Sequence, residues 1–318
     1  MAVGSPAASQ ALVRRTLASS GADWRGVAFS AFLLFCIVFA LAVIAVLVAQ
    51  VVARGMPVFT DRGADFLAAN LSSRAGTAGV GQGIAGSLFI ALFVVILAIP
   101  VGVMTAVYLE EYAPDNKVTR FISINIRNLA GVPSVVYGLL GLAIFVPVTR
   151  AIEGLIFPDL GGTGRSVVAA SITLSALVLP IVIITSAEAI RAVPGTIREA
   201  GFGVGASRWQ VTRGLVLPSA IPGILTGTIL SISRALGETA PLIIIGVSYN
   251  FFSTGNRDTV ESLFGPFTAL PAIVYGWASN PNTDFRELTA AAIVVLLAVT
   301  LLANAIAILL RNRYEIKW

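Results

Sequence analysis

Two charged side chains stand four residues apart inside a long apolar stretch of this 318-residue chain: Arg234 and Glu238. An arginine or an aspartate at the middle of a membrane helix costs about 2.5–3.5 kcal/mol on insertion scales, so such residues usually have a function. In one continuous helix the two side chains would share a face. Arginine before glutamate is, however, the less favourable order for stabilising a helix. Helix stability alone is therefore a weak reason for the pair.

The chemistry that this pair could do is the transient binding of an oxyanion. The guanidinium of Arg234 is a planar fork of donors that suits a tetrahedral oxyanion, and Glu238 could hold it while no anion is present. Rapid transit needs weak binding, which a nearby carboxylate favours. Pro241 has no N–H and disturbs the carbonyl of Gly237, so we expect a kinked helix face that lines a pathway. Thr239 is a lesser candidate through its hydroxyl. The alternative is a structural ion pair that is neutralised against neighbouring helices.

A segment of mixed polarity, residues 192–217, lies between two apolar stretches just before this pair. Gly205 allows a sharp turn, and Pro218 suits the first turn of the helix that follows. We expect two short helices that project from the membrane. Exposed Phe202 and Trp209 would need a partner to cover them, whereas the alternative is an ordinary loop. The residues that mark the segment are Glu199, Ala200, Gly201, Gly205, Leu217 and Pro218.

Composition places the chain in the membrane. It is 57% hydrophobic and 12% charged, with a mean hydropathy of +0.90, whereas a soluble protein has about 25% charged residues. A spanning helix needs about 20 mostly apolar residues, and the sequence contains six such stretches. We therefore predict an all-α integral membrane protein with six transmembrane helices. The expected spans are residues 27–53, 84–109, 129–149, 166–190, 218–246 and 288–310, in a membrane domain of residues 26–311 between tails of residues 1–25 and 312–318.

Orientation follows from the distribution of lysine and arginine. Thirteen of the 21 lie on the side of the two termini and seven on the other side, with Arg234 in between. Because cytoplasmic loops carry an excess of these residues, we predict that both termini and the 192–217 segment are cytoplasmic. On the same side, residues 114–128 place Lys117, Arg120 and Arg127 among apolar residues. That pattern is typical of an amphipathic helix at the membrane interface, and a solvated connector is the alternative.

Several other chemistries are excluded by the residues present. One cysteine, Cys36, forms no disulfide framework, and without histidine the commonest metal ligand is missing. No nucleophile or metal cluster is visible, so we expect no enzyme, catalytic residue, metal or cofactor. Residues 81–86 match a dinucleotide fingerprint, but they open a membrane helix instead of following a strand. No Gly-Lys pair exists for a P-loop, so ATP hydrolysis by that mechanism belongs to another chain. Aromatic and basic residues do not interleave, which argues against nucleic acid.

The 192–217 segment resembles the EAA loop of permease subunits in ATP-binding-cassette (ABC) importers. Glu199-Ala200-Gly201, then Gly205, then Leu215 to Pro218 follow the spacing of that loop. Gly201 stands where the usual residue is alanine. In that family the loop inserts into a groove on a separate cytoplasmic ATPase and transmits its closure to the pore. The resemblance implies the type I ABC importer permease fold, with six transmembrane helices in the bacterial cytoplasmic (inner) membrane.

Residues 106–114, 128–138 and 233–242 are similar to permeases of phosphate importers. The Glu-Glu-Tyr-Ala-Pro run at 110–114 resembles the PstA-type subunit more than its PstC-type partner. The resemblance implies import of inorganic phosphate with a PstC-like second permease, an ABC ATPase dimer and an extracytoplasmic phosphate-binding protein. Permeases for sulfate, molybdate or phosphonate remain the alternatives. An ion-coupled secondary carrier is a further alternative, although only two ionisable groups lie deep in the spans.

Overall fold

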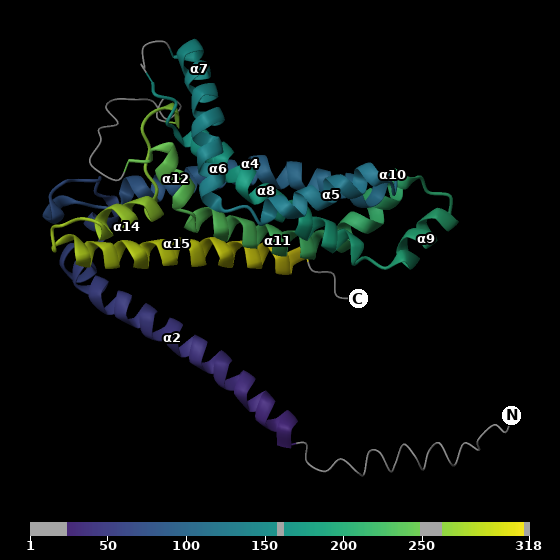
Figure 1. The fold of residues 1–318 in the computed structure, drawn as a ribbon, viewed down its shortest axis with the longest axis horizontal. Coiled ribbons are helices and arrows are strands. Elements are labelled where there is room, and N and C mark those ends of the chain that lie inside the picture. The colour runs from purple at the N-terminus through teal and green to yellow at the C-terminus, as the bar shows by residue number, and fades with distance from the viewer. Residues whose placement is uncertain (1–23, 158–161, 249–262, 315–318) are drawn as a thin grey trace. The chain divides into compact units, whose positions relative to one another are not determined.

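The computed structural model describes residues 24–157, 162–248 and 263–314 (Figure 1). The chain divides between Val51 and Val52 into two units, which are described separately. The described residues form helices and no strands. Six helical stretches among them are long and apolar enough to cross a membrane, so the predicted all-α fold with six candidate spans is confirmed. They are Trp24–Arg62, Gly81–Tyr112, Ser134–Ile156, Val167–Arg191, Arg208–Gly237 and Phe285–Arg313.

The described part of the first unit is the beginning of helix α2 (Trp24–Arg62). Large apolar side chains are exposed all around this part of the helix. A helix that is apolar on every side is stable only when it is surrounded by protein or by lipid. The helix therefore has the character of a membrane span. Its last residues belong to the second unit, where the backbone of Gly55 lies against Ala291 of helix α15 (Phe285–Tyr314).

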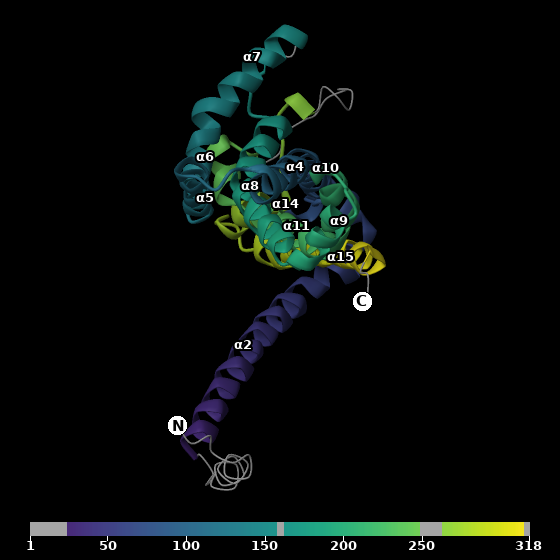
Figure 2. The same cartoon turned by 90° about the vertical axis from the view of Figure 1, so that its right-hand side faces the viewer.

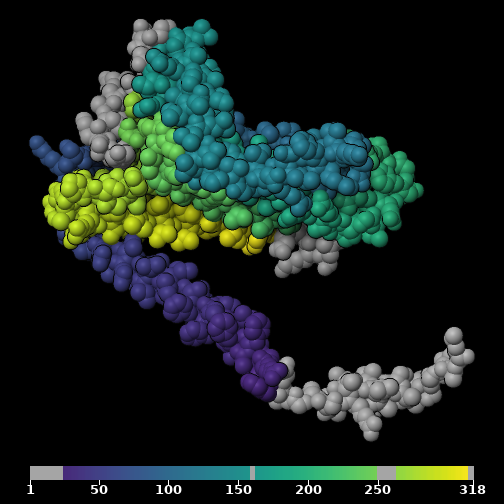
Figure 3. Space-filling model, in the orientation of Figure 1, coloured from purple at the N-terminus to yellow at the C-terminus, as the bar shows by residue number. Residues whose placement is uncertain are grey.

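Helix α8 (Val167–Arg191) is the central helix of the second unit. Helices α4 (Gly81–Val107) and α11 (Leu217–Gly237) pack along it, and α15 packs on α11 (Figures 1 and 2). The larger part of α8 is buried, whereas most of α4 and α15 keeps an apolar face exposed, and α15 lies along the surface in yellow in Figure 3. In a membrane protein such faces suit lipid or a second subunit. The shorter elements are α3 (Ala64–Ala68), the 3₁₀ turn Ala75–Thr77, α9 (Gly195–Gly203), α10 (Arg208–Val211), α12 (Ala240–Ile245) and α14 (Leu270–Ala278).

The described residues contain three π-helical turns, each of which precedes a proline. In each turn, the N–H of one residue donates to the carbonyl five residues earlier, and the next residue after this donor is the proline. Proline lacks an N–H and its ring crowds the carbonyl four residues earlier, and a wider turn moves that carbonyl away. The helix therefore continues through the second and third prolines without a break. The donors are Ala113, Val146 and Leu217, and the residues that follow them are Pro114, Pro147 and Pro218.

The span expected over residues 129–149 is divided at a corner. Helix α5 (Lys117–Ala130) ends there, and α6 (Ser134–Leu140) begins a new helix that continues through a π turn into α7 (Val146–Ile156). The corner follows from Pro133, which disfavours the helical conformation in the residue before it. Helix α5 runs alongside α8, while α6 and α7 run across that direction (Figures 1 and 2). Helix α5 is the amphipathic helix expected over residues 114–128, and its place at the membrane interface stays a prediction.

The glycine pattern at residues 81–86 has a packing role. A Cβ on Gly83 would collide with the side chain of Ile273, and one on Gly86 with the carbonyl oxygen of Thr268. The glycines therefore let the start of α4 approach α14 and the residues before it. The pattern opens a helix and follows no strand, as expected from the sequence.

Candidate functional site

Arg234 and Glu238 form an ion pair in the structure. Arg234 lies in the last turn of α11, and its Nε is 3.1 Å from Oε1 of Glu238. The two side chains are 37% and 19% exposed, so the pair is reachable from outside the protein. A cation in the last turn is also favoured by the negative end of the helix dipole.

The expectation that both residues share one continuous helix face was wrong. Helix α11 ends at Gly237, and Glu238 has an extended conformation with φ −76° and ψ 120°. The span expected over 218–246 is thus interrupted, and α12 begins only at Ala240. The physical reason is Pro241, which supplies no N–H and would crowd the carbonyl of Gly237. Thr239, at the N-cap of α12, makes no side-chain bond to the start of that helix.

Contacts between α11 and α8 show where the Arg234–Glu238 pair lies along the central helix. The two helices run antiparallel, with Gly223 and Gly227 packed on Ala189 and Thr185. Arg234 is seven residues beyond Gly227, which is about 10 Å along a helix. Stepping the same distance back along α8 reaches the region of Val178, near the middle of Val167–Arg191. The ion pair therefore lies near half the length of the central helix.

The stretches 128–138 and 233–242 are brought together beside this pair. Helix α6 packs on α12, and a Cβ on Gly138 would collide with the Cα of Pro241. The hydroxyl of Tyr137 donates to the carbonyl of Leu129 (3.0 Å) and so ties α6 to α5 across the corner. On the other side, Ser233 is hydrogen-bonded to Asn304 of α15 (2.5 Å). The break after α11 thus lies between α6 and α15.

The 192–217 segment contains a helix on each side of Gly205, as predicted. Helix α9 ends in a left-handed turn, with φ +83° at Gly205. There the N–H groups of Gly205 and Ala206 bond the carbonyls of Phe202 and Gly201, which is the Schellman pattern. Helix α10 then begins with a capping box between Ser207 and Gln210.

Pro218 lies in the first turn of α11, as expected, since that helix begins at Leu217. Helix α10 continues through the π turn Thr212–Val216 into α11, so one helical stretch runs from Arg208 to Gly237. The continuity of α11 with α10 was not expected from the sequence. The wide turn before Pro218 accommodates the proline ring and preserves the helix.

An exposed apolar patch covers the turn between α9 and α10. Phe202, Val204 and Trp209 are 49%, 85% and 56% exposed. Gly201 is buried beneath the patch, where a Cβ would press on the side chains of Val211 and Leu215. The glycine therefore allows α9 to pack closely on the following helix. Glu199 and Ala200 are exposed on α9.

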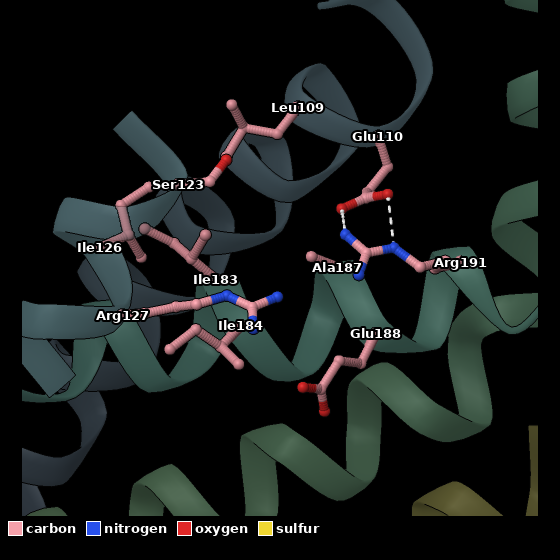
Figure 4. Close-up of a pocket in the computed structure, with 10 residues that line it drawn as sticks. All are labelled: Leu109, Glu110, Ser123, Ile126, Arg127, Ile183, Ile184, Ala187, Glu188 and Arg191. Atoms are coloured by element: carbon pink, nitrogen blue, oxygen red, sulfur yellow. Dashed lines mark hydrogen bonds and ion pairs between the residues drawn. The ribbon is translucent and has the colours of Figure 1, made fainter. Parts of the chain in front are cut away.

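Sequence reasoning missed a set of ion pairs at the end of α4. Arg191 donates to both carboxylate oxygens of Glu110 (Figure 4), and Arg198 donates from Nε and Nη2 to Oε1 of Glu111 (3.1 and 2.8 Å). The guanidinium of Arg208 lies 5.8 Å from the ring centre of Tyr112. The only signal in the sequence was two adjacent acids at the end of an apolar stretch, with arginines in a later segment.

A small cavity lies between α4, α5 and α8 beside these ion pairs (Figure 4). Arg127 of α5 and Glu188 of α8 line it, together with Glu110 and Arg191. The exposed side chain of Glu188 lies here among charged neighbours. The cavity places polar side chains along the flank of α8, near its C-terminal end.

Comparison with known proteins identifies the family. Residues 98–316 match the family described as binding-protein-dependent transport system inner membrane component. The phosphate transport system permease protein PstA of Yersinia pestis is 32% identical over 72% of this chain and 71% of its own length. PstA 1 of Mycobacterium tuberculosis (strain ATCC 25618 / H37Rv) is 32% identical over 73% and 69%. The probable ABC transporter permease YqgI of Bacillus subtilis is 35% identical, over only 56% of each chain.

A solved structure shows the same fold. A chain of the inward-facing MetNI methionine ABC transporter superposes with a TM-score of 0.50 and 20% identity, over 75% of this chain and 95% of that one. The chain therefore belongs to the binding-protein-dependent transport family and is a multi-pass inner-membrane permease of an ABC importer.

The turn at Gly205 generates a prediction about the order of the 192–217 segment. Left-handed backbone costs a residue with a Cβ about 1–2 kcal/mol, which corresponds to about a 5- to 30-fold change in an equilibrium. Gly205→Ala should raise hydrogen-exchange rates at the capping amides of α10 by about that factor. Gly203→Ala is the matched control, because that helical glycine also has open space around it. Equal exchange in both variants would show that the turn does not need glycine.

Proposed function

We propose that this chain is the PstA-like permease subunit of a bacterial importer that carries inorganic phosphate into the cytoplasm. ATP hydrolysis on a separate subunit drives the transport. The observation that carries the proposal is the Arg234–Glu238 pair, partly exposed at a helix break near half the length of α8. Its support is the likeness to PstA proteins, whose names state phosphate transport, over about 70% of the chain.

The geometry suits an arginine latch for an anion in transit. Without phosphate, Arg234 donates to Glu238. An arriving phosphate offers oxygens to the same planar fork and displaces the carboxylate. The freed carboxylate then repels the anion, so the bound state stays weak enough for release. Backbone groups freed by the break at residues 238–239 and the hydroxyl of Thr239 could contact the anion as it passes, since irregular backbone at this depth is tolerated where it lines a cavity.

The proposed partners come from the family resemblance, and for the ATPase an exposed surface supports the proposal. The exposed patch of Phe202, Val204 and Trp209 is the surface on which an ABC ATPase dimer docks. Glu199, Ala200 and Gly201 lie on α9, which we call the docking helix. The excess of lysine and arginine on this side supports a cytoplasmic location for the segment and for both termini. A PstC-like permease supplies the other half of the pathway. A phosphate-binding protein delivers the substrate on the opposite face.

Phosphate as the substrate is tested with the assembled transporter in lipid vesicles. Phosphate-loaded binding protein should stimulate ATP hydrolysis and uptake, because the binding protein selects the anion that reaches Arg234. Sulfate-loaded and molybdate-loaded binding proteins of related importers serve as matched controls and should stimulate neither. Stimulation by one of these instead of phosphate would assign the chain to another oxyanion.

The latch predicts a specific loss on substitution of its arginine. Arg234→Gln should abolish phosphate uptake, since the amide has neither the charge nor the fork, while the complex still assembles and hydrolyses ATP. Arg120→Gln is the control, because Arg120 is exposed and its nearest carboxylate, Asp115, is 3.9 Å away. Uptake by Arg234→Gln at the wild-type rate would leave the pair with a structural role only.

A further inference from the structure

Three consecutive residues at the C-terminal end of α4 each contact a different arginine. These arginines lie in or next to the 192–217 segment, which we call the docking segment. We call Glu110, Glu111 and Tyr112 the α4 hub. Arg191 is the last residue of α8, Arg198 lies in α9, and Arg208 is the first residue of α10. The hub therefore contacts the chain at three places: before α9, within α9 and after α9. The pairs are Glu110 with Arg191, Glu111 with Arg198, and Tyr112 with Arg208.

The Glu111–Arg198 pair is the most buried of the three contacts. Their side chains are 8% and 23% exposed, whereas Arg191 in the neighbouring pair is 59% exposed. Arg198 also donates to the carbonyls of Val193 (2.7 Å) and Ile190 (2.8 Å). One guanidinium thus joins the end of α4, the last turn of α8 and the start of α9. Hydrogen bonds between charged groups in such partly buried sites are stronger than surface ion pairs.

Helix stability does not explain the two acids of the hub. Glu110 and Glu111 lie in the π turn Tyr108–Tyr112 at the C-terminal end of α4. Negative charge at a helix C-terminus is unfavourable, because the unpaired carbonyls there already carry partial negative charge. The acids are therefore compensated by the arginines of the other elements and not by their own helix. Their placement has a reason only in the contact between α4 and the docking segment.

The covalent connections of α9 to the membrane helices are short but turn sharply. Residues 192–194 link α9 to α8, and the left-handed turn at Gly205 links it to α10. Such turns can bend, so they transmit a displacement poorly. The contacts of Arg198 bypass both turns. Because α4 packs closely along α8, with Gly102 against Val182, a force applied at the hub reaches both helices together.

We propose that the α4 hub, and the Glu111–Arg198 pair above all, is the joint that passes movement of the docking helix to α4 and α8. The proposal rests on the proposed docking of the 192–217 segment on an ATPase. Arg198 acts here as a positioning residue, since it lies remote from the Arg234–Glu238 pair along α8. The route adds to the continuous helix from Arg208 to Gly237, which reaches the anion latch directly.

The test uses the complete transporter reconstituted in vesicles, with three readouts: co-purification of the ATPase, ATP hydrolysis, and phosphate taken up per ATP. Glu111→Gln removes the ion pair but keeps the hydrogen bonds that Arg198 donates to two backbone carbonyls. Arg198→Gln removes the ion pair and these hydrogen bonds. Each variant should retain the ATPase while uptake per ATP falls at least about fivefold, the lower range of a typical coupling between sites. The double variant should be no worse than Arg198→Gln alone, because Glu111 acts only through Arg198. Arg198→Lys should recover only part of the loss.

The control is Asp115→Asn, which removes the exposed pair with Arg120 just beyond the hub and should leave all three readouts unchanged. Unchanged uptake per ATP in Glu111→Gln would overturn the joint, and so would loss of the ATPase from that variant, which would indicate a role in docking or folding. If Arg198→Gln fails to assemble, Glu111→Gln decides alone. Phe202→Asp tests the docking itself: retention of the ATPase by that variant would contradict the proposed docking surface and not the joint.

Discussion

The ion pair between Glu111 and Arg198 is the contact on which the arrangement of the docking segment depends. It joins helix ends that are 87 residues apart in sequence and fixes α9 against the two best-packed membrane helices. Without it, α9 would be attached by a three-residue link, a glycine turn and its packing on Val211 and Leu215. The apolar patch on α9 and α10 gains a defined position because its base is held by charge-assisted hydrogen bonds. A partner that binds this patch can displace α4 and α8 only if the patch is held rigidly against these helices.

Two prolines give the helix that follows the segment its two properties. Pro218 is preceded by a π turn, so the helix passes it and remains continuous from Arg208 to Gly237. Pro241 is preceded by a break, so the helix ends and Arg234 and Glu238 become partly exposed. The difference lies in the turn before each proline. A wide turn removes the clash, whereas an extended residue avoids it by leaving the helix. At Pro218 the helix is therefore continuous with the docking segment, and before Pro241 it ends and leaves the ion pair partly exposed.

The sequence predicted what depends on local patterns. Length and apolarity gave the helical membrane fold, and the spacing around Gly205 predicted the turn between two helices. The pairing of Arg234 with Glu238 was also expected, although through a continuous helix. The corner before Pro133 and the break before Pro241 were missed because a proline alone does not show whether a helix bends, widens or stops. The hub was missed for a different reason. Glu111 and Arg198 are far apart in sequence, and nothing near either residue indicates the other.

The most direct measurement of the central claim is the distance between α4 and α9 during the transport cycle. Spin labels at Met104→Cys on α4 and Thr196→Cys on α9, both exposed positions, would report it in a Cys36→Ser chain within the assembled transporter. If the hub joins the two helices, the distance stays the same between the nucleotide-free and ATP-bound states. In Glu111→Gln the same labels should show a broader distribution that shifts with ATP. A distance that changes on ATP binding in the chain with an intact hub would contradict the account.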